Sequence, residues 1–276
     1  MMRYSKAYVE IVNFCNKKCS FCPKTERAPR LMTDNEFRNI IEKLKGVTEY
    51  VYYHVVGEPL MHPFLADFIK YAGEQGFKSA VTTNGTFLKT RGDALINAGV
   101  YKVNISVHSF EGGEPEKHAE YLTNCLDFAE KASNAGVLTV LRLWNQGKDN
   151  GLNISTVDMI KERFGEFDKI SPRGARIKSK LHLEYGERFV WPDMKEEDMG
   201  CNVFCYGLKD HFAILCDGSV VPCCLDREGA ITLGNVHETD INEILESPRA
   251  QAIRNGFQKR EATEELCRKC GYARRF

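Results

Sequence analysis

Hydrophobic positions in residues 5–185 alternate between short β-like runs and stretches with helical spacing. Runs rich in β-branched and aromatic residues predict strands at 7–13, 50–56, 78–83, 101–107, 137–143 and 175–185. Apolar residues at a spacing of three and four predict helices at 33–44, 64–75, 93–97, 116–133 and 156–164. The regular alternation is the main feature of this part of the chain.

The ends of the predicted helices carry recognisable signals. Thr33 and Glu36 form a capping-box pattern at the start of the first helix. Gly76, Gly99 and Gly136 follow other helices at the position where a left-handed glycine often ends a helix. These signals support the predicted boundaries.

Strands that alternate with helices of this length imply βαβ units and a parallel sheet. We therefore predict an α/β fold, a partial (βα)6 TIM-like barrel over residues 1–195, with a small C-terminal cysteine-rich β-hairpin and helix module over residues 196–276. In such barrels, functional residues lie on loops at the carboxyl ends of the strands.

Composition narrows the function classes. The chain has 276 residues with Lys+Arg and Asp+Glu balanced at 38 each, so it lacks the positive charge that typifies nucleic-acid binding. It has neither a signal-peptide pattern nor an apolar run long enough for a membrane-spanning helix. Eleven cysteines in such a chain indicate metal ligands rather than disulfides, and a cytoplasmic location.

Three of these cysteines, Cys15, Cys19 and Cys22, lie in one short loop after the first strand. Thiolates suit iron–sulfur clusters or zinc, because sulfur is a soft ligand. Three ligands are one short of a closed site, so a 4Fe–4S cluster held here would keep one iron open. The alternatives are a zinc knuckle and a chance cluster.

The spacing C-x3-C-x2-C resembles the signature of the radical S-adenosylmethionine (radical SAM) superfamily, with Phe21 at the usual aromatic position before the third cysteine. The resemblance implies that S-adenosylmethionine chelates the open iron. It also implies that the reduced cluster cleaves the cofactor to a 5′-deoxyadenosyl radical, which abstracts a substrate hydrogen. A flavodoxin- or ferredoxin-type protein is the expected electron donor.

Other residues that match the family pattern follow successive predicted strands. Gly57 and Glu58 follow the second strand, Thr83 and Asn84 the third, and Ser106 ends the fourth. The resemblance implies that all five contribute to the S-adenosylmethionine site. A glutamate could pair with the ammonium of the cofactor, and a glycine leaves the backbone open to a ligand. The alternative for the Gly-Glu-Pro segment is a solvated turn.

Two departures from the family pattern concern the cofactor and the substrate. Many relatives carry an arginine about a dozen residues after the strand-four serine, but this region reads Glu-Lys-His at 116–118. Arg142, on the fifth strand, could contact the cofactor carboxylate instead, or could face the helices. His108 replaces the usual aspartate and is the candidate catalytic or substrate-contacting residue, or a simple strand cap.

A basic row marks the sixth predicted strand. Period-two alternation places Arg176, Lys178, Lys180 and His182 on one face. We expect Lys178, Lys180 and His182 to bind an anionic substrate group if this face lines the barrel. The alternative is a solvated face.

Seven of the eleven cysteines lie after residue 195. A predicted hairpin at 212–221 would bring Cys205 and Cys223 together, and a helix at 241–255 could return Cys267 and Cys270 to them. Four thiolates close either an iron–sulfur or a zinc site.

This arrangement resembles the SPASM and twitch extensions of radical SAM enzymes, and the short C-terminus matches the twitch type. The resemblance implies one auxiliary 4Fe–4S cluster ligated by Cys205, Cys223, Cys267 and Cys270, with Cys224 as an alternative to Cys223. The layout is similar to that of small alcohol-oxidising members of the 2-deoxy-scyllo-inosamine dehydrogenase type. Cys125 is expected in the core, and Cys201 and Cys216 have no predicted role.

The resulting hypothesis is a radical SAM oxidoreductase that oxidises a small substrate with the help of the auxiliary cluster. The alternative within the family is a maturase of a ribosomally made peptide or protein, although the early first strand leaves no room for a preceding leader-recognition domain. The alternative from another class is a zinc-binding interaction module.

Overall fold

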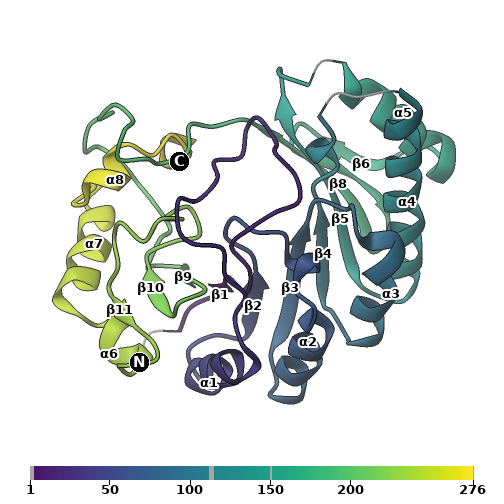
Figure 1. Cartoon of the computed structure of the whole chain (residues 1–276). Helices are drawn as coiled ribbons and strands as arrows, with labels where there is room; N and C mark the ends of the chain where they lie inside the picture. Colours follow the sequence, from purple (N-terminus) through teal and green to yellow (C-terminus); the bar gives the residue numbers. More distant parts are fainter. Residues whose placement is uncertain (1–2, 112–114, 150, 276) are drawn as a thin grey trace.

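The computed structural model describes residues 3–111, 115–149 and 151–275 (Figure 1). Within these ranges eleven strands form one sheet in the order β11-β10-β9-β1-β2-β3-β4-β5-β8-β7-β6. The strands are β1 Lys6–Val9, β2 Tyr50–Tyr53, β3 Lys78–Thr83, β4 Lys102–Ile105, β5 Leu138–Gln146, β6 Asp168–Ser171, β7 Gly174–Lys178, β8 Leu181–Glu187, β9 His211–Ile214, β10 Ser219–Val221 and β11 Gly234–Asn235.

The predicted parallel barrel is confirmed. Strands β1 to β5 and then β8 pair in parallel, each with the next. The C-terminal part of the chain extends this sheet, because β9 pairs in parallel with the free side of β1 and continues into the hairpin with β10. The predicted hairpin therefore forms, and it also completes one edge of the barrel wall.

Helices cover the outer face of the curved sheet (Figure 1). They are α1 Asp34–Leu44, α2 Leu65–Glu74, α3 Leu88–Asn97, α4 Pro115–Asn134 and α5 Leu152–Phe164, with 3-10 turns η1 Pro59–Met61 and η2 Val107–Ser109 after β2 and β4. Thr33 and Glu36 form the predicted capping box at the start of α1. Phe37 of α1 stacks on Phe68 of α2 with ring centroids 4.1 Å apart. Burial of each ring contributes about 1.5–3 kcal/mol of transfer free energy.

The strands present different residues to their two faces. In β2, Val51 and Tyr53 are fully buried under the helices. Tyr52 and His54 alternate with them and line a cavity on the inner side of the sheet. This alternation gives the barrel a helix-covered outer face and an inner face open to ligands.

The prediction of a single sixth strand at 175–185 is wrong. Residues 174–178 and 181–187 form two antiparallel strands, β7 and β8, with β6 beyond them. The register between β7 and β8 shifts between Arg176 and Lys178, so period two does not continue across the row. Arg176 lies opposite His182, whereas Lys178 lies opposite the buried Leu181.

The C-terminal module continues with short helices. They are α6 Ile241–Leu245, α7 Pro248–Gln258 and α8 Glu265–Arg268, followed by the 3-10 turn η3 Tyr272–Arg275. The predicted helix at 241–255 is interrupted, because the Ser247 side chain caps the N-terminus of α7 and Pro248 occupies its first turn. No helix among the described residues is long and apolar enough to cross a membrane. The domain boundary at residue 195 stays a prediction.

Candidate functional site

The loop after β1 carries the three N-terminal cysteines into a cavity. Cys15, Cys19 and Cys22 all line this cavity. The backbone N–H of Cys22 donates to the Cys19 carbonyl at 3.2 Å, and the N–H of Lys17 donates to the Cys15 sulfur at 3.4 Å. The tight turn keeps the three thiols on one side of the loop.

Glu58 is a buried carboxylate at the carboxyl end of β2, and three donors hold it. Thr83 Oγ1 and the N–H of Leu60 donate to Oε1 at 2.7 and 3.0 Å, and the N–H of Asn84 donates to Oε2 at 2.7 Å. Burial raises the pKa of Glu58 to about 7, although these three hydrogen bonds act in the opposite direction. Thr83 and Asn84 therefore orient a carboxylate at the edge of the cavity.

Gly57 allows two loops to approach closely. A Cβ atom built at Gly57 would lie 1.9 Å from the Val12 carbonyl oxygen and 3.1 Å from that of Phe14. The N–H of Glu58 also donates to the Phe14 oxygen at 3.0 Å. The glycine thus packs the Glu58 segment against the loop after β1 that leads to Cys15.

Asn84 connects this carboxylate to the cysteine loop. Its Nδ2 donates to Asn16 Oδ1 at 2.8 Å and to the Cys15 sulfur at 3.4 Å. Ser106 lies one strand further along the same edge and also lines the cavity. The residues that the sequence placed after successive strands therefore meet at one site.

Phe21 and His108 form the next part of the wall, with ring centroids 4.8 Å apart. The Nδ1 atom of His108 lies 2.8 Å from the Arg142 carbonyl oxygen, which can only accept a hydrogen bond. The Trp144 N–H also approaches Nδ1, at 3.4 Å, but the shorter contact with the carbonyl oxygen favours the tautomer with the proton on Nδ1, which leaves Nε2 as an acceptor. Burial lowers the pKa of His108 to about 4, so the ring is neutral at neutral pH.

Arg142 faces the cavity, not the helices. Its guanidinium pairs with Glu184 at 3.2 Å and lies over the Trp144 ring at 4.7 Å. A second arginine, Arg188, lies just after β8 and also lines the cavity, although no pattern predicted it. Arg188 lies over Phe21 at 5.3 Å and donates to the Ser20 hydroxyl at 3.2 Å. Its isolated position in a linker gave no signal in the sequence.

The four predicted auxiliary ligands line the same cavity from the opposite side. These ligands are Cys205, Cys223, Cys267 and Cys270. The pKa of Cys223 is raised mainly by burial, and the nearby thiols of the other three cysteines raise it further. Cys224 is also near this group, since among the thiols it contributes most to the raised pKa of Cys223, but its own thiol contacts the Tyr8 hydroxyl. Cys223 therefore lies among the other three predicted ligands, whereas Cys224 contacts Tyr8, and this difference favours Cys223 as the ligand.

The remaining cysteines have other surroundings. Cys216 is buried, and its thiol donates to the Glu10 carbonyl at 2.9 Å. The Glu10 carboxylate accepts from the N–H of Cys216 at 3.0 Å and from Arg27 at 2.7 Å, which ties the cysteine loop to the C-terminal hairpin. Cys125 is fully buried, as expected, and Cys201 is exposed.

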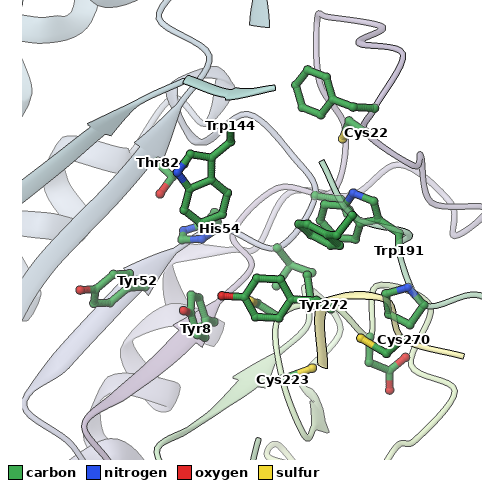
Figure 2. A pocket seen from close by; sticks show the side chains of 18 of the residues that line it. Tyr8, Cys22, Tyr52, His54, Thr82, Trp144, Trp191, Cys223, Cys270 and Tyr272 are labelled. Carbon is green, nitrogen blue, oxygen red and sulfur yellow. The ribbon is translucent and has the colours of Figure 1, made fainter. Parts of the chain in front are cut away.

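One cavity of about 510 Å³ joins the two cysteine groups. In Figure 2, Cys22 lies on one side, Cys223 and Cys270 on another, and Tyr272 lies between these two and Tyr8. All eight residues predicted for cofactor binding or catalysis line this cavity: Phe21, Gly57, Glu58, Thr83, Asn84, Ser106, Arg142 and His108.

The predicted anion-binding row does not reach this cavity. Of the described residues, Lys178, Lys180 and His182 are absent from its lining. Lys178 instead contacts Glu130 of α4 at 3.3 Å and lies over Phe164 of α5 at 4.9 Å. Lys180 is exposed in the turn between β7 and β8. The basic residues looked like one face of a single strand in the sequence. They are divided because the chain turns between β7 and β8 and the register between these strands shifts.

The donor set fits an iron–sulfur cluster at each cysteine group. Burial and the neighbouring Cys22 raise the pKa of Cys19 to about 11, and burial also raises the pKa values of Cys205 and Cys267. Among the described residues no three potential ligand side chains come close enough together to hold a single metal ion, but thiols spaced around a larger cluster form thiolates when that positive group lies among them. The buried carboxylate of Glu58 beside the N-terminal group likewise suits a cationic partner.

Comparison with protein families gives two matches. Residues 9–160 match the profile of the radical SAM superfamily, and residues 205–271 match SPASM, an iron–sulfur cluster-binding domain. The two matches contain the two cysteine groups. They support 4Fe–4S clusters and S-adenosylmethionine, and they do not support the zinc alternatives.

Curated relatives match less than half of this chain. The GTP 3′,8-cyclase of Aquifex aeolicus is 29% identical in an alignment of 134 positions that covers 44% of this chain and 40% of the cyclase. The tungsten-containing aldehyde ferredoxin oxidoreductase cofactor-modifying protein of Pyrococcus furiosus is 32% identical in an alignment of 85 positions that covers 29% of this chain and 24% of that protein. The chain thus spans less than half the length of these relatives.

Solved structures share the whole fold. BtrN in complex with AdoMet and 2-DOIA has a TM-score of 0.62 at 18% identity, covering 98% of this chain and 94% of BtrN. Streptococcus suis SuiB bound to S-adenosylmethionine also has a TM-score of 0.62, at 15% identity, covering 98% and 72%. The protein anSMEcpe with bound AdoMet has a TM-score of 0.61 at 14% identity, covering 97% and 88%.

Proposed function

Because the chain belongs to the radical SAM superfamily, we propose that it is an oxidoreductase that removes a hydrogen atom and then an electron from a small substrate. The observation that carries this proposal is the single cavity lined by both cysteine groups. A substrate bound between them can react near the N-terminal group and lie close to an electron acceptor at the C-terminal group.

The N-terminal site divides into residues that hold metal and residues that hold S-adenosylmethionine. Cys15, Cys19 and Cys22 would hold a 4Fe–4S cluster, and Glu58 would accept a hydrogen bond from the cofactor ammonium. When bound and reduced, this cluster supplies the electron that cleaves S-adenosylmethionine to the 5′-deoxyadenosyl radical. Phe21 would lie beside the adenine.

Gly57, Thr83, Asn84 and Ser106 support this site in different ways. Gly57 permits the close approach of two loops, and Thr83 and Asn84 orient Glu58 by hydrogen bonds. Ser106 ends β4 at the cavity, where a hydroxyl can reach the cofactor.

Arg142 would bind the carboxylate of the cofactor. His108 would bind the substrate. Arg142 is the arginine of β5 that lines the cavity. With its proton fixed on Nδ1, His108 offers Nε2 as an acceptor for a substrate hydroxyl.

The C-terminal thiols of Cys205, Cys223, Cys267 and Cys270 would hold one auxiliary 4Fe–4S cluster. A two-electron oxidation needs a second one-electron acceptor after the hydrogen atom has been removed. The C-terminal group lies on the cavity, as that role requires.

The second candidate function is maturation of a peptide or protein side chain. It is favoured by the similar fold of anSMEcpe, which has been solved with AdoMet and a peptide. The cavity of this chain lies between the barrel strands, the cysteine loop and the C-terminal module, and it is lined by many aromatic side chains. A concave aromatic site of this kind favours the small substrate.

The proposal is tested with anaerobically reconstituted protein. With reductant and S-adenosylmethionine, it should release 5′-deoxyadenosine, even slowly without substrate, and a flavodoxin or ferredoxin should replace the chemical reductant. We also propose a cytoplasmic location, because the reducing conditions there keep cysteine thiols available as cluster ligands. Protein that holds its full iron content but releases no 5′-deoxyadenosine would disprove the proposed activity.

A further inference from the structure

The cavity extends from the cysteine loops into the barrel, where four aromatic side chains form its floor. This floor cluster consists of Tyr8, Tyr52, His54 and His211. Tyr8 is at the centre, with its ring centroid 5.5 Å from Tyr52, 5.1 Å from His54 and 5.5 Å from His211. Figure 2 shows Tyr8, Tyr52 and His54 on the side of the cavity opposite Cys270.

Each of the two cations that flank the floor cluster has an acidic partner. Lys6 pairs with Asp210 at 2.9 Å, and Arg142 pairs with Glu184 at 3.2 Å. A phosphate or carboxylate entering this part of the cavity would compete with an existing ion pair for either cation. It would also have to lose its own hydration, which is costly for an ion.

The histidines of the floor cluster are uncharged at neutral pH. Burial lowers the pKa of His54 to about 3, and the positive charges of Arg142 and Lys6 act in the same direction. Burial also lowers the pKa of His211. The four side chains of the floor cluster therefore carry no charge at neutral pH, and each neutral imidazole has one donor and one acceptor nitrogen.

Three side chains that line the cavity have a buried polar atom without a protein partner. Among the described residues these atoms are His54 Nδ1, Trp144 Nε1 and Arg188 Nε, and Arg188 lies over Phe21 of the cysteine loop. The indole N–H can only donate, so its missing partner is an acceptor. A hydroxyl group of a bound molecule can accept a hydrogen bond from Trp144 and donate one to another group. The protein hydroxyls of Tyr8, Tyr52 and Thr82 can each serve as a further donor or acceptor.

We propose that the floor cluster and Trp144 bind a neutral, polyhydroxylated small molecule, and that this is the substrate class of the enzyme. The inference rests on the proposed function and specifies its substrate. Flat aromatic faces pack against the C–H faces of a ring such as a cyclitol or a monosaccharide, while the phenol, imidazole and indole groups bond its hydroxyls. At the floor cluster a nucleoside triphosphate would meet only cations that already have acidic partners, because Lys17 and Lys24, which also line the cavity, belong to the cysteine loop. A peptide would need an open groove.

The test is equilibrium dialysis of the anaerobic holoenzyme, loaded with S-adenosylmethionine, against four labelled probes. These are myo-inositol, D-glucose, guanosine triphosphate and a neutral hexapeptide. We expect saturable binding of at least one of the two polyols, at least tenfold tighter than that of either other probe. If neither polyol binds saturably, or if the triphosphate or the peptide binds more tightly, the proposal is wrong.

Variants of the floor cluster locate the binding. His54→Phe and Tyr52→Phe should each weaken binding of the polyol about three- to tenfold, the effect of losing one hydrogen bond. Lys178→Ala, on the outer face, is the matched control and should bind normally. Equal binding by wild type and both floor variants would contradict the assigned site.

Iron content and the release of 5′-deoxyadenosine without substrate are measured on the same preparations. Tyr52→Phe removes a single hydroxyl, so it remains informative if His54→Phe does not fold. Failure of 5′-deoxyadenosine release in the wild type would disprove the proposed function, whereas normal release with exclusive binding of the triphosphate or peptide would overturn only the substrate class.

Discussion

Glu58 is the residue whose environment predicts a pH effect on cofactor binding. Its pKa is raised to about 7 by burial, so below pH 7 the protonated form predominates. The carboxylate form pairs with an ammonium, and cofactor binding must therefore release a proton at lower pH. We expect the Kd for S-adenosylmethionine to rise as pH falls from 7 to 6, by up to about tenfold.

Glu58→Gln supplies the control for that effect. The amide keeps an oxygen that can accept from Thr83 or Leu60, but it lacks the charge. The variant should bind S-adenosylmethionine about 1.5–3 kcal/mol more weakly at pH 8, with no dependence on pH between 6 and 7. A wild-type affinity in the variant would mean that the Gly-Glu-Pro segment is only a turn.

Cys223 and Cys224 offer a matched pair of substitutions. Cys223 lies among the other three thiols of the C-terminal group, whereas Cys224 contacts Tyr8. Cys223→Ser should lower the iron content of the reconstituted protein or shift the electron paramagnetic resonance signal of one cluster, and Cys224→Ser should change neither. The opposite result would make Cys224 the ligand.

Parallel strands explain why the sequence could predict much of the site. Glu58, Thr83 and Asn84 each follow a strand, and the carboxyl ends of neighbouring parallel strands meet at one edge. The same local reasoning failed after β5, because Ser179 and Lys180 turn the chain without a glycine or proline signal. The shift of register that separates Arg176 from Lys178 depends on pairing between strands, which period-two reasoning does not include.

The segment between β2 and η1 supports a prediction about stability. In Gly57→Ala, the new Cβ would meet the Val12 carbonyl oxygen at 1.9 Å, so the two loops would have to separate. We expect a loss of about 2 kcal/mol or more in the free energy of unfolding, measured by denaturant titration of the apoprotein. Gly73→Ala, inside α2 where a Cβ would meet nothing within 4 Å, is the control and should keep wild-type stability or gain up to about 1 kcal/mol. Equal stability of the two variants would show that the loop contact is not required.

At the scale of the whole molecule, the C-terminal module is part of the barrel wall. Strand β9 pairs with β1, and the Glu10 carboxylate joins Arg27 of the cysteine loop to Cys216 of the C-terminal hairpin. The sequence predicted the two cysteine groups but not this junction, because pairing between residues two hundred positions apart has no local pattern. The floor cluster was missed for a related reason, since Tyr8 and His211 come from opposite ends of the chain.

The central claim is that two separate cysteine groups hold two 4Fe–4S clusters on one cavity, and iron analysis with Mössbauer spectroscopy tests it most directly. The wild-type protein should hold about eight irons per chain, and the triple Cys15/Cys19/Cys22→Ala variant about four, still as a 4Fe–4S cluster. Stoichiometric zinc in the wild type, or a triple variant without any iron, would contradict this account.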